Sequence, residues 1–179
     1  VTSEIGIVSQ LQNAGAKYIL VATVPDLGLT PAFRALGPTA QAQGTALSTN
    51  YNNALFGALS SNGLRVIPLD TFTLIREITA NAGAYGFTNI TGTACQPQIT
   101  ANSLTCNPTS YVTPTAPDTY LFADGVHPTS RAHQILAQYA VSVLEAPRQI
   151  AALPHSTAVV GRARAARVAN HLGGKPGGG

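Results

Sequence analysis

Charged side chains are scarce in this sequence, since only 9% of its 179 residues are Asp, Glu, Lys or Arg. Small and uncharged polar residues take their place, a composition that we associate with secreted proteins. The chain has no run of about 18 consecutive apolar residues, which excludes a helix that spans a membrane. It contains no methionine, begins with Val1 inside a predicted helix and shows no signal peptide. We therefore expect it to be a piece cut from a longer precursor.

Cysteine is also rare. The two cysteines, Cys95 and Cys106, lie close together in a segment rich in turn-forming residues, and neither has a histidine beside it. This pattern disfavours a metal site, and we predict a local disulfide bond between them. Two free buried thiols are the alternative. A disulfide would indicate an oxidising compartment, so we expect a protein that is secreted or displayed on the cell surface.

The basic residues are unevenly distributed. Residues 1–146 carry five basic and seven acidic side chains, whereas residues 147–179 carry five basic side chains and no acidic one. This basic tail has no interleaved aromatic residues and no recognised binding motif, so we expect no nucleic-acid partner. We divide the chain into a globular unit over 1–146, a basic linker helix over 147–172 and a flexible glycine-rich end over 173–179.

Helical and extended patterns alternate along the globular unit. The spacing of apolar residues predicts helices over 2–14, 39–61, 71–80 and 129–145, with strands over 17–24, 64–69 and 120–123. Such alternation predicts parallel strands joined by right-handed crossovers, with helices on both faces of the sheet. The fold class is therefore α/β, and we expect a three-layer α/β/α sandwich of the flavodoxin-like sort.

The alternation lapses between residues 81 and 118. This segment is rich in Asn, Thr, Gly and Pro and contains both cysteines. We predict a long loop that is clipped by the Cys95–Cys106 bond. Loops of this length are often functional, and this one leads into the strand before Asp124. We expect it to form a wall of a substrate pocket, and an insertion that faces solvent is the alternative.

The most informative stretch is Asp124-Gly125-Val126-His127-Pro128. An apolar run ends in the acid, and a glycine then permits a sharp turn. Pro128 suits the first position of the following helix, which would put His127 at or near its N-cap. Asp124 would hold Nδ1 of the imidazole and leave Nε2 free as a base. The alternative is an ordinary turn and helix entrance. Asp26, in a Pro-Asp turn, we assign a structural role as a turn former.

The string D-G-V-H-P-T-S-R-A-H resembles the last motif of the GDSL (SGNH) esterase and lipase family, D-x-x-H-P-[ST]-x-x-G-H. Ala132 stands where that motif has glycine. Residues 12–31 also resemble the central region of these enzymes, particularly that of the surface-displayed autotransporter esterases. The resemblance implies an SGNH-hydrolase fold and implies that Asp124 and His127 are the second and third members of a catalytic triad.

The other motifs of that family are missing from the chain. There is no G-D-S-[LY] block with a nucleophilic serine, and no G-x-N-D block for the oxyanion hole. None of the serines present lies in a glycine-flanked turn between a strand and a helix, the setting that exposes a nucleophile. We therefore expect the C-terminal portion of the hydrolase fold, which carries the acid and the base but lacks the nucleophile and the oxyanion groups.

The resemblance implies a carboxylic-ester hydrolase with an ester (acyl) substrate and without a metal or organic cofactor. The partners that it implies are the missing N-terminal half of the domain and, beyond the basic linker, a C-terminal outer-membrane β-barrel. Two other functions stay open. One is a non-catalytic surface or adhesion passenger that keeps the fold without the chemistry, and the other is a carbohydrate deacetylase of the same family.

Overall fold

The computed structural model describes residues 1–100 and 102–145. The predicted linker (147–172) and glycine-rich end (173–179) lie outside the described residues. The α-helices of the described part are α1 (Thr2–Asn13), α2 (Pro31–Ala35), α3 (Pro38–Ser61), α4 (Thr71–Ala80), α5 (Ala116–Thr119) and α6 (Ser130–Glu145). Short 3₁₀ helices are η1 (Leu27–Leu29), η2 (Ala82–Tyr85), η3 (Ser103–Thr105) and η4 (Pro108–Ser110). The strands are β1 (Leu20–Ala22), β2 (Ile67–Leu69), β3 (Asn89–Thr93) and β4 (Tyr120–Phe122).

Local sequence signals set the starts of α3 and α4. α3 starts at Pro38, whose fixed φ suits the first helical position, after Gly37 turns the chain with a φ of +90°. α4 starts after Asp70, whose side chain accepts a hydrogen bond from Thr73 N at 2.9 Å. Each of these signals lies at the start of the helix that it begins. The predictions of α3 and α4 are accordingly confirmed to within one residue.

The strands confirm the α/β class. β1 pairs with β2 in parallel, with Leu20 opposite Ile67, and β3 pairs with β4 in parallel, with Asn89 opposite Tyr120. Within the described residues these are two separate two-stranded ladders. The strands are also shorter than predicted, since the apolar run over 17–24 gives a three-residue strand whose last residue is exposed.

The predicted loop over 81–118 is wrong in one respect. It contains β3, which forms a parallel pair with β4 and brings part of this segment into the fold. The sequence Asn-Ile-Thr-Gly-Thr has neither a continuous apolar run nor a clean alternation, so its pattern does not indicate a strand. The strand is formed by pairing with β4, about thirty residues further along the chain. Local propensity does not predict such a pairing.

Two apolar clusters form the core. The larger one gathers residues of α4, β4 and α6, and the smaller one joins α1 to α3. The larger cluster contains Leu69, Leu74, Ile78, Tyr85, Phe87, Leu121, Phe122, Ala132, Ile135, Tyr139 and Val143, and the smaller one Val8, Ile19, Leu55 and Leu59. In α6 the buried residues recur every three or four positions, as the sequence predicts. Burial of a side chain the size of Ile135 contributes roughly 1.5–3 kcal/mol.

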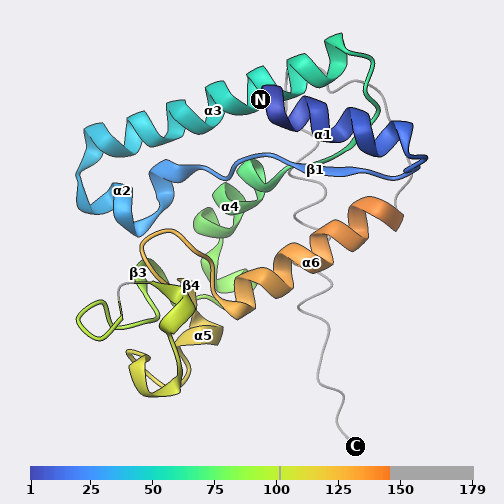
Figure 1. Cartoon of the computed structure of the whole chain (residues 1–179). Coiled ribbons are helices and arrows are strands. Elements are labelled where there is room, and N and C mark those ends of the chain that lie inside the picture. The colour runs from blue at the N-terminus through green and yellow to red at the C-terminus, as the bar shows by residue number, and fades with distance from the viewer. Residues whose placement is uncertain (101, 146–179) are drawn as a thin grey trace, which may run out of the picture.

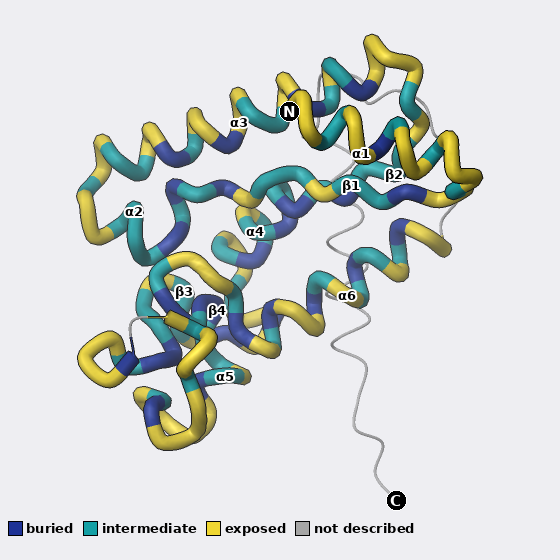
Figure 2. The backbone as a smooth tube through the Cα atoms, viewed as in Figure 1, coloured by how far each residue is buried: buried dark blue, intermediate teal, exposed yellow. Residues whose placement is uncertain are grey.

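Figure 1 shows how these elements are arranged. α1 lies beside α3. α6 runs from the β3/β4 end of the molecule along the side opposite α3. Figure 2 shows that the helices bury the faces that they turn toward the strands, and that the loops around β3 and β4 are more exposed. None of the described helices combines the length and the apolar character that crossing a membrane requires.

Candidate active site

The candidate site lies in the loop that follows β4. This loop folds back on its own strand, because Ala123 N donates to His127 O at 2.8 Å and Pro128 pairs with Phe122 in an antiparallel bridge. The helix therefore begins at Ser130 and not at Pro128. The sequence predicts His127 at or near the helix N-cap, and the residue lies three positions before the first helical residue, near the N-cap but not at it. Pro128 suits an extended segment as well as a first helical turn, and here it is extended.

Thr129 instead joins the loop to α6. Its hydroxyl donates to Tyr120 O at 2.7 Å and accepts from Ala132 N at 3.4 Å. One side chain thus holds both the start of β4 and the first turn of the helix. The loop between them, which carries Asp124 and His127, is fixed at both ends.

Asp124 and His127 contact each other as the sequence predicts. Nδ1 of His127 lies 2.8 Å from Oδ2 of Asp124 and 3.0 Å from Oδ1. The side chain of His127 is 65% exposed, whereas that of Asp124 is only 7% exposed. The buried acid therefore holds one ring nitrogen, and the opposite edge of an accessible ring carries Nε2. This arrangement suits a histidine that exchanges protons with a bound molecule.

The Asp124 carboxylate also accepts three main-chain hydrogen bonds. Oδ1 accepts from His127 N at 2.7 Å and from Val126 N at 2.9 Å, and Oδ2 accepts from Ser103 N at 2.7 Å. Burial raises the pKa of this carboxyl group, but the main-chain donors of His127 and Val126, the His127 ring and the Ser103 donor outweigh burial and hold the pKa below its usual range. Asp124 is therefore a carboxylate at neutral pH.

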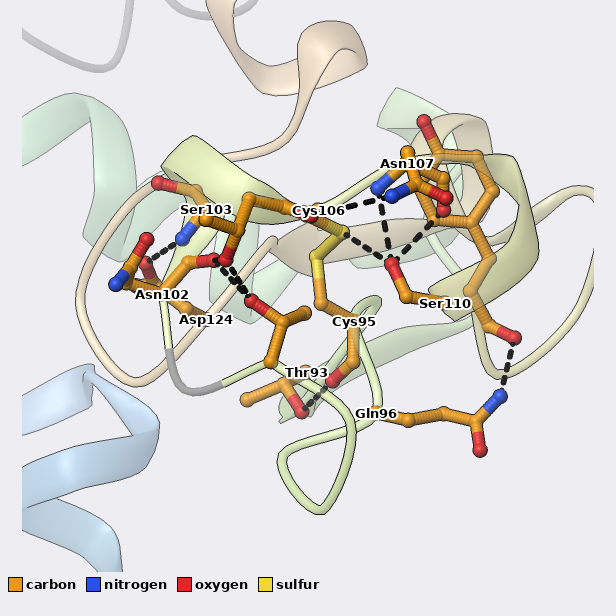
Figure 3. The surroundings of a disulfide bond; sticks show 12 residues. Thr93, Cys95, Gln96, Asn102, Ser103, Cys106, Asn107, Ser110 and Asp124 are labelled. Atoms are coloured by element: carbon orange, nitrogen blue, oxygen red, sulfur yellow. Dashed lines mark hydrogen bonds between the residues drawn. A yellow bond between two sulfur atoms is a disulfide. The ribbon is translucent and has the colours of Figure 1, made fainter.

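Ser103 belongs to the disulfide loop, by which we mean the described residues between Cys95 and Cys106. The Cys95–Cys106 bond is present, so the predicted disulfide is confirmed. Figure 3 shows the bond between the Asn102–Ser103 turn, which faces Asp124, and the Asn107–Ser110 turn. The loop therefore reaches the candidate site. Sequence reasoning missed the Ser103 contact, because a main-chain N–H leaves no signature in the residue type.

Asp26 is confirmed as a structural residue. It is fully buried and accepts hydrogen bonds from Gly28 N at 3.1 Å, from the Thr45 hydroxyl at 2.6 Å and from Arg76 Nη1 at 2.8 Å. These partners connect the turn of η1 to α3 and α4. All of them belong to the framework of the fold. The Arg76 side chain is 54% exposed, but its guanidinium stays protonated and cannot act as a base.

Other chemistry is sparse in the described part of the chain. No hydroxyl group there is hydrogen-bonded to the His127 ring, and no cluster of three or more His, Cys, Asp or Glu side chains is placed to hold a metal. A hollow of about 380 Å³ lies at the amino ends of β1 and β2, lined by residues such as Lys17, Ile19 and Arg65. Neither Asp124 nor His127 lines it.

Comparison with known proteins gives one consistent result. The family model described as GDSL-like lipase/acylhydrolase matches residues 5–140. Esterase EstA of Pseudomonas aeruginosa is 40% identical over 144 residues, which is 78% of this chain and 21% of that protein. GDSL esterase/lipase APG of Arabidopsis thaliana is 31% identical over 140 residues, 73% of this chain and 40% of that protein. The chain thus spans about a fifth of the first relative and two fifths of the second.

Proposed function

Because the chain belongs to the GDSL-like lipase/acylhydrolase family, we propose that it supplies the acid and the base of a serine-dependent carboxylic-ester hydrolase. Membership of this family implies hydrolysis and an ester substrate. The observation that carries the residue assignment is the 2.8 Å contact between Oδ2 of the buried Asp124 and Nδ1 of the exposed His127. Asp124 is the orienting acid, and His127 is the general base.

Acylation and deacylation, the two halves of the proposed reaction, each have two proton transfers through His127. A serine from a segment outside these 179 residues attacks the ester carbonyl, and Nε2 of His127 takes the proton of its hydroxyl group. The same nitrogen returns that proton to the oxygen of the leaving alcohol as the C–O bond breaks. Water then attacks the acyl-serine by the reverse exchange and releases the carboxylic acid.

Asp124 supports both transfers without giving up or taking a proton. Its carboxylate accepts the Nδ1–H of His127, which selects the tautomer that has a lone pair on Nε2. It also stabilises the imidazolium that forms in each transition state. The main-chain donors around Asp124 keep the carboxyl group ionised, as this role requires. The chemistry uses no metal or organic cofactor.

A non-catalytic surface or adhesion passenger is the second candidate. A G-D-S block upstream in the full gene would favour the hydrolase, and its absence from the full gene would favour the passenger. A carbohydrate deacetylase of the same family is a variant of the first candidate, since it cleaves an ester by the same two proton transfers. Its leaving group would be a sugar hydroxyl and its acyl group an acetate.

We also propose that the protein acts outside the cytoplasm, on the cell surface or after secretion. The Cys95–Cys106 bond supports this location, because disulfides persist in oxidising compartments. The proposed partner on the C-terminal side is an outer-membrane β-barrel through which the basic segment 147–172 runs. That proposal rests on the resemblance to autotransporter esterases and on the charge of the segment.

The test uses the longer protein of which this chain is part, purified with and without Asp124→Asn, and p-nitrophenyl butyrate as substrate. We expect the substitution to lower kcat by about 10³–10⁴-fold, because the amide no longer selects the reactive tautomer. Asp118→Asn, at an exposed position of α5, is the matched control. A wild-type protein without activity on this ester or on acetylated sugars would favour the passenger, and unchanged kcat in Asp124→Asn would refute the residue assignment.

A further inference from the structure

The oxygen of Asp124 that binds the His127 ring is also bound by a group from the disulfide loop. Oδ2 lies 2.8 Å from His127 Nδ1 and 2.7 Å from Ser103 N. We propose that the disulfide loop is a positioning element of the site, in which the Ser103 N–H fixes Oδ2 of Asp124 for His127 and the Cys95–Cys106 bond holds Ser103 in place. The effect of the Ser103–Asp124 contact on catalysis rests on the proposed function, whereas the contact itself does not.

The loop is anchored to the strand that carries Asp124. Cys95 is 2% exposed, and its N–H donates to Ala123 O at 2.9 Å, one residue before Asp124. Cys106 lies three residues after Ser103 and is covalently joined to Cys95. The disulfide therefore joins Cys95, the hydrogen-bond partner of Ala123, to the turn whose Ser103 N–H binds Asp124. Figure 3 shows Ser103 and Asp124 on the same side of this bond.

A second turn of the same loop region shows that position 103 does not need an N–H for folding. η3 and η4 both follow an asparagine in extended conformation, whose side chain accepts a hydrogen bond from the main chain two residues on. In η4 the first residue is Pro108, which has no N–H. In η3 the first residue is Ser103, and its N–H is the one that Asp124 accepts. The donor thus serves Asp124 and not the turn.

The charge state of Asp124 gives the contact its chemical effect. A buried carboxylate is stabilised in its ionised form by each N–H that it accepts. The Ser103 donor also restrains the rotation of the carboxyl group about its Cβ–Cγ bond, so Oδ2 stays within hydrogen-bonding distance of His127 Nδ1. Ser103 acts through Asp124 and touches neither the ring nor a substrate, and so it is a positioning residue.

Ser103→Pro isolates this hydrogen bond. Proline fits the first residue of a 3₁₀ turn, and Asn102, with φ −142° and ψ +159°, has the extended conformation that a residue before proline adopts. The substitution removes the N–H and leaves the turn. Ser103→Ala is the matched variant, because it loses the hydroxyl but keeps the main-chain donor.

The first readout is the ¹³C titration of the Asp124 carboxyl carbon in the 179-residue chain. We expect Ser103→Pro to raise the midpoint by at least about half a pH unit, and Ser103→Ala to keep it near that of the wild type. In the wild type, the Ser103 amide should exchange with solvent at least about 10-fold more slowly than an unprotected amide. Equal midpoints in the proline and alanine variants, or an unprotected Ser103 amide, would overturn the proposal.

The second readout is kcat of the longer protein. A charge-assisted hydrogen bond of this kind corresponds to about a 10-fold effect, so kcat of Ser103→Pro should be about 10-fold below that of Ser103→Ala, with KM unchanged. If Ser103→Pro does not fold, the Cys95→Ser/Cys106→Ser variant takes its place, with a raised Asp124 midpoint and faster Ser103 exchange expected. If Ser103→Pro alters the Asp124 titration but the longer wild-type protein is inactive, the proposed function alone is refuted. An unaltered titration would refute the positioning role alone.

Discussion

The two buried acids of the described chain differ in their partners, and this difference separates a structural role from a chemical one. Asp26 binds a turn amide, a hydroxyl group and Arg76, all of which are parts of the framework. Asp124 binds three main-chain amides and the ring of His127, which is 65% exposed. Both residues are aspartates and both are buried, Asp26 more completely than Asp124. Arg76 is exposed too, at 54%, but its guanidinium keeps its protons, whereas an imidazole can gain and lose one. The exposed imidazole of His127 therefore makes Asp124 a candidate for catalysis.

The depressed pKa of Asp124 makes folding stability depend on pH. Because the folded state keeps the carboxylate ionised below its ordinary pKa of about 4, Asp124 contributes its full stability above about pH 5. That contribution is lost as the pH falls below 4 toward the folded-state pKa. Urea unfolding of wild type and Asp124→Asn should therefore give a difference in free energy that is largest near pH 7 and shrinks toward pH 3. A difference that is constant over this range would contradict the assignment.

The contact between Asp124 and His127 could be predicted because it is local. The partners are three positions apart, and the hydrogen bonds from Val126 N and His127 N to Oδ1 of Asp124 close the turn between them. The Ser103 contact could not be predicted, because it joins main chain to side chain across 21 residues and depends on the path of the disulfide loop. The observed start of α6 differs from the predicted start for a related reason. The pairing of Pro128 with Phe122, which decides it, is a tertiary contact.

At the scale of elements, α3 packs on η1 where Gly44 of the helix meets Gly28 of the 3₁₀ turn. A Cβ atom at Gly44 would lie 2.8 Å from Gly28 N and 2.8 Å from the Phe33 ring. At Gly57, in the same helix, a Cβ atom would meet nothing within 4 Å. The same substitution should therefore have opposite effects at the two positions.

Gly57→Ala should stabilise the protein by about 0.5–1 kcal/mol, because alanine is the better helix former. Gly44→Ala should destabilise it by about 1–3 kcal/mol, since the contact with main-chain atoms of η1 forces the two elements apart. Thermal melting of the two variants beside the wild type gives both signs in one experiment. A stabilising Gly44→Ala would show that α3 and η1 are not in close contact.

The disulfide loop should lose stability when its bond is reduced. Closure of so short a loop stabilises by about 2–3 kcal/mol through the entropy of the unfolded chain. We expect intact-mass analysis to show the oxidised form in exported protein, and reduction to lower the melting temperature. Two alkylatable thiols in native, unreduced protein would contradict the pairing.

The helices could be predicted better than the strands. Apolar periodicity, Pro38 and Asp70 define α3 and α4 almost residue by residue, because helix signals are local. β3 has a polar sequence with an internal glycine and depends on pairing with β4, so its pattern carries no such signal. The parallel pairing of β1 with β2 follows from the alternation of elements, as predicted. The pairing of β3 with β4 and the division into two ladders have no counterpart in the sequence pattern.

At the scale of the whole molecule, the chain covers 21% of esterase EstA and carries the acid–base motif without a G-D-S block. We therefore expect the purified 179-residue chain not to hydrolyse p-nitrophenyl butyrate, because loss of the nucleophile removes nearly all of the chemistry. The chain should nevertheless fold, and its Asp124 carboxyl group should titrate as described above. Ester turnover that survives chromatography and disappears in His127→Ala would show that the nucleophile lies within this chain.

The most direct measurement is kcat for p-nitrophenyl butyrate in the longer protein that contains this chain, with His127→Ala compared with His133→Ala. Both histidines belong to the motif, but His133 lies on the exposed side of α6 and has no part in the proposed chemistry. We expect His127→Ala to lower kcat by about 10³-fold or more with little change in melting temperature, and His133→Ala to retain wild-type kcat. Full activity in His127→Ala, or an equal loss in both variants, would contradict this expectation.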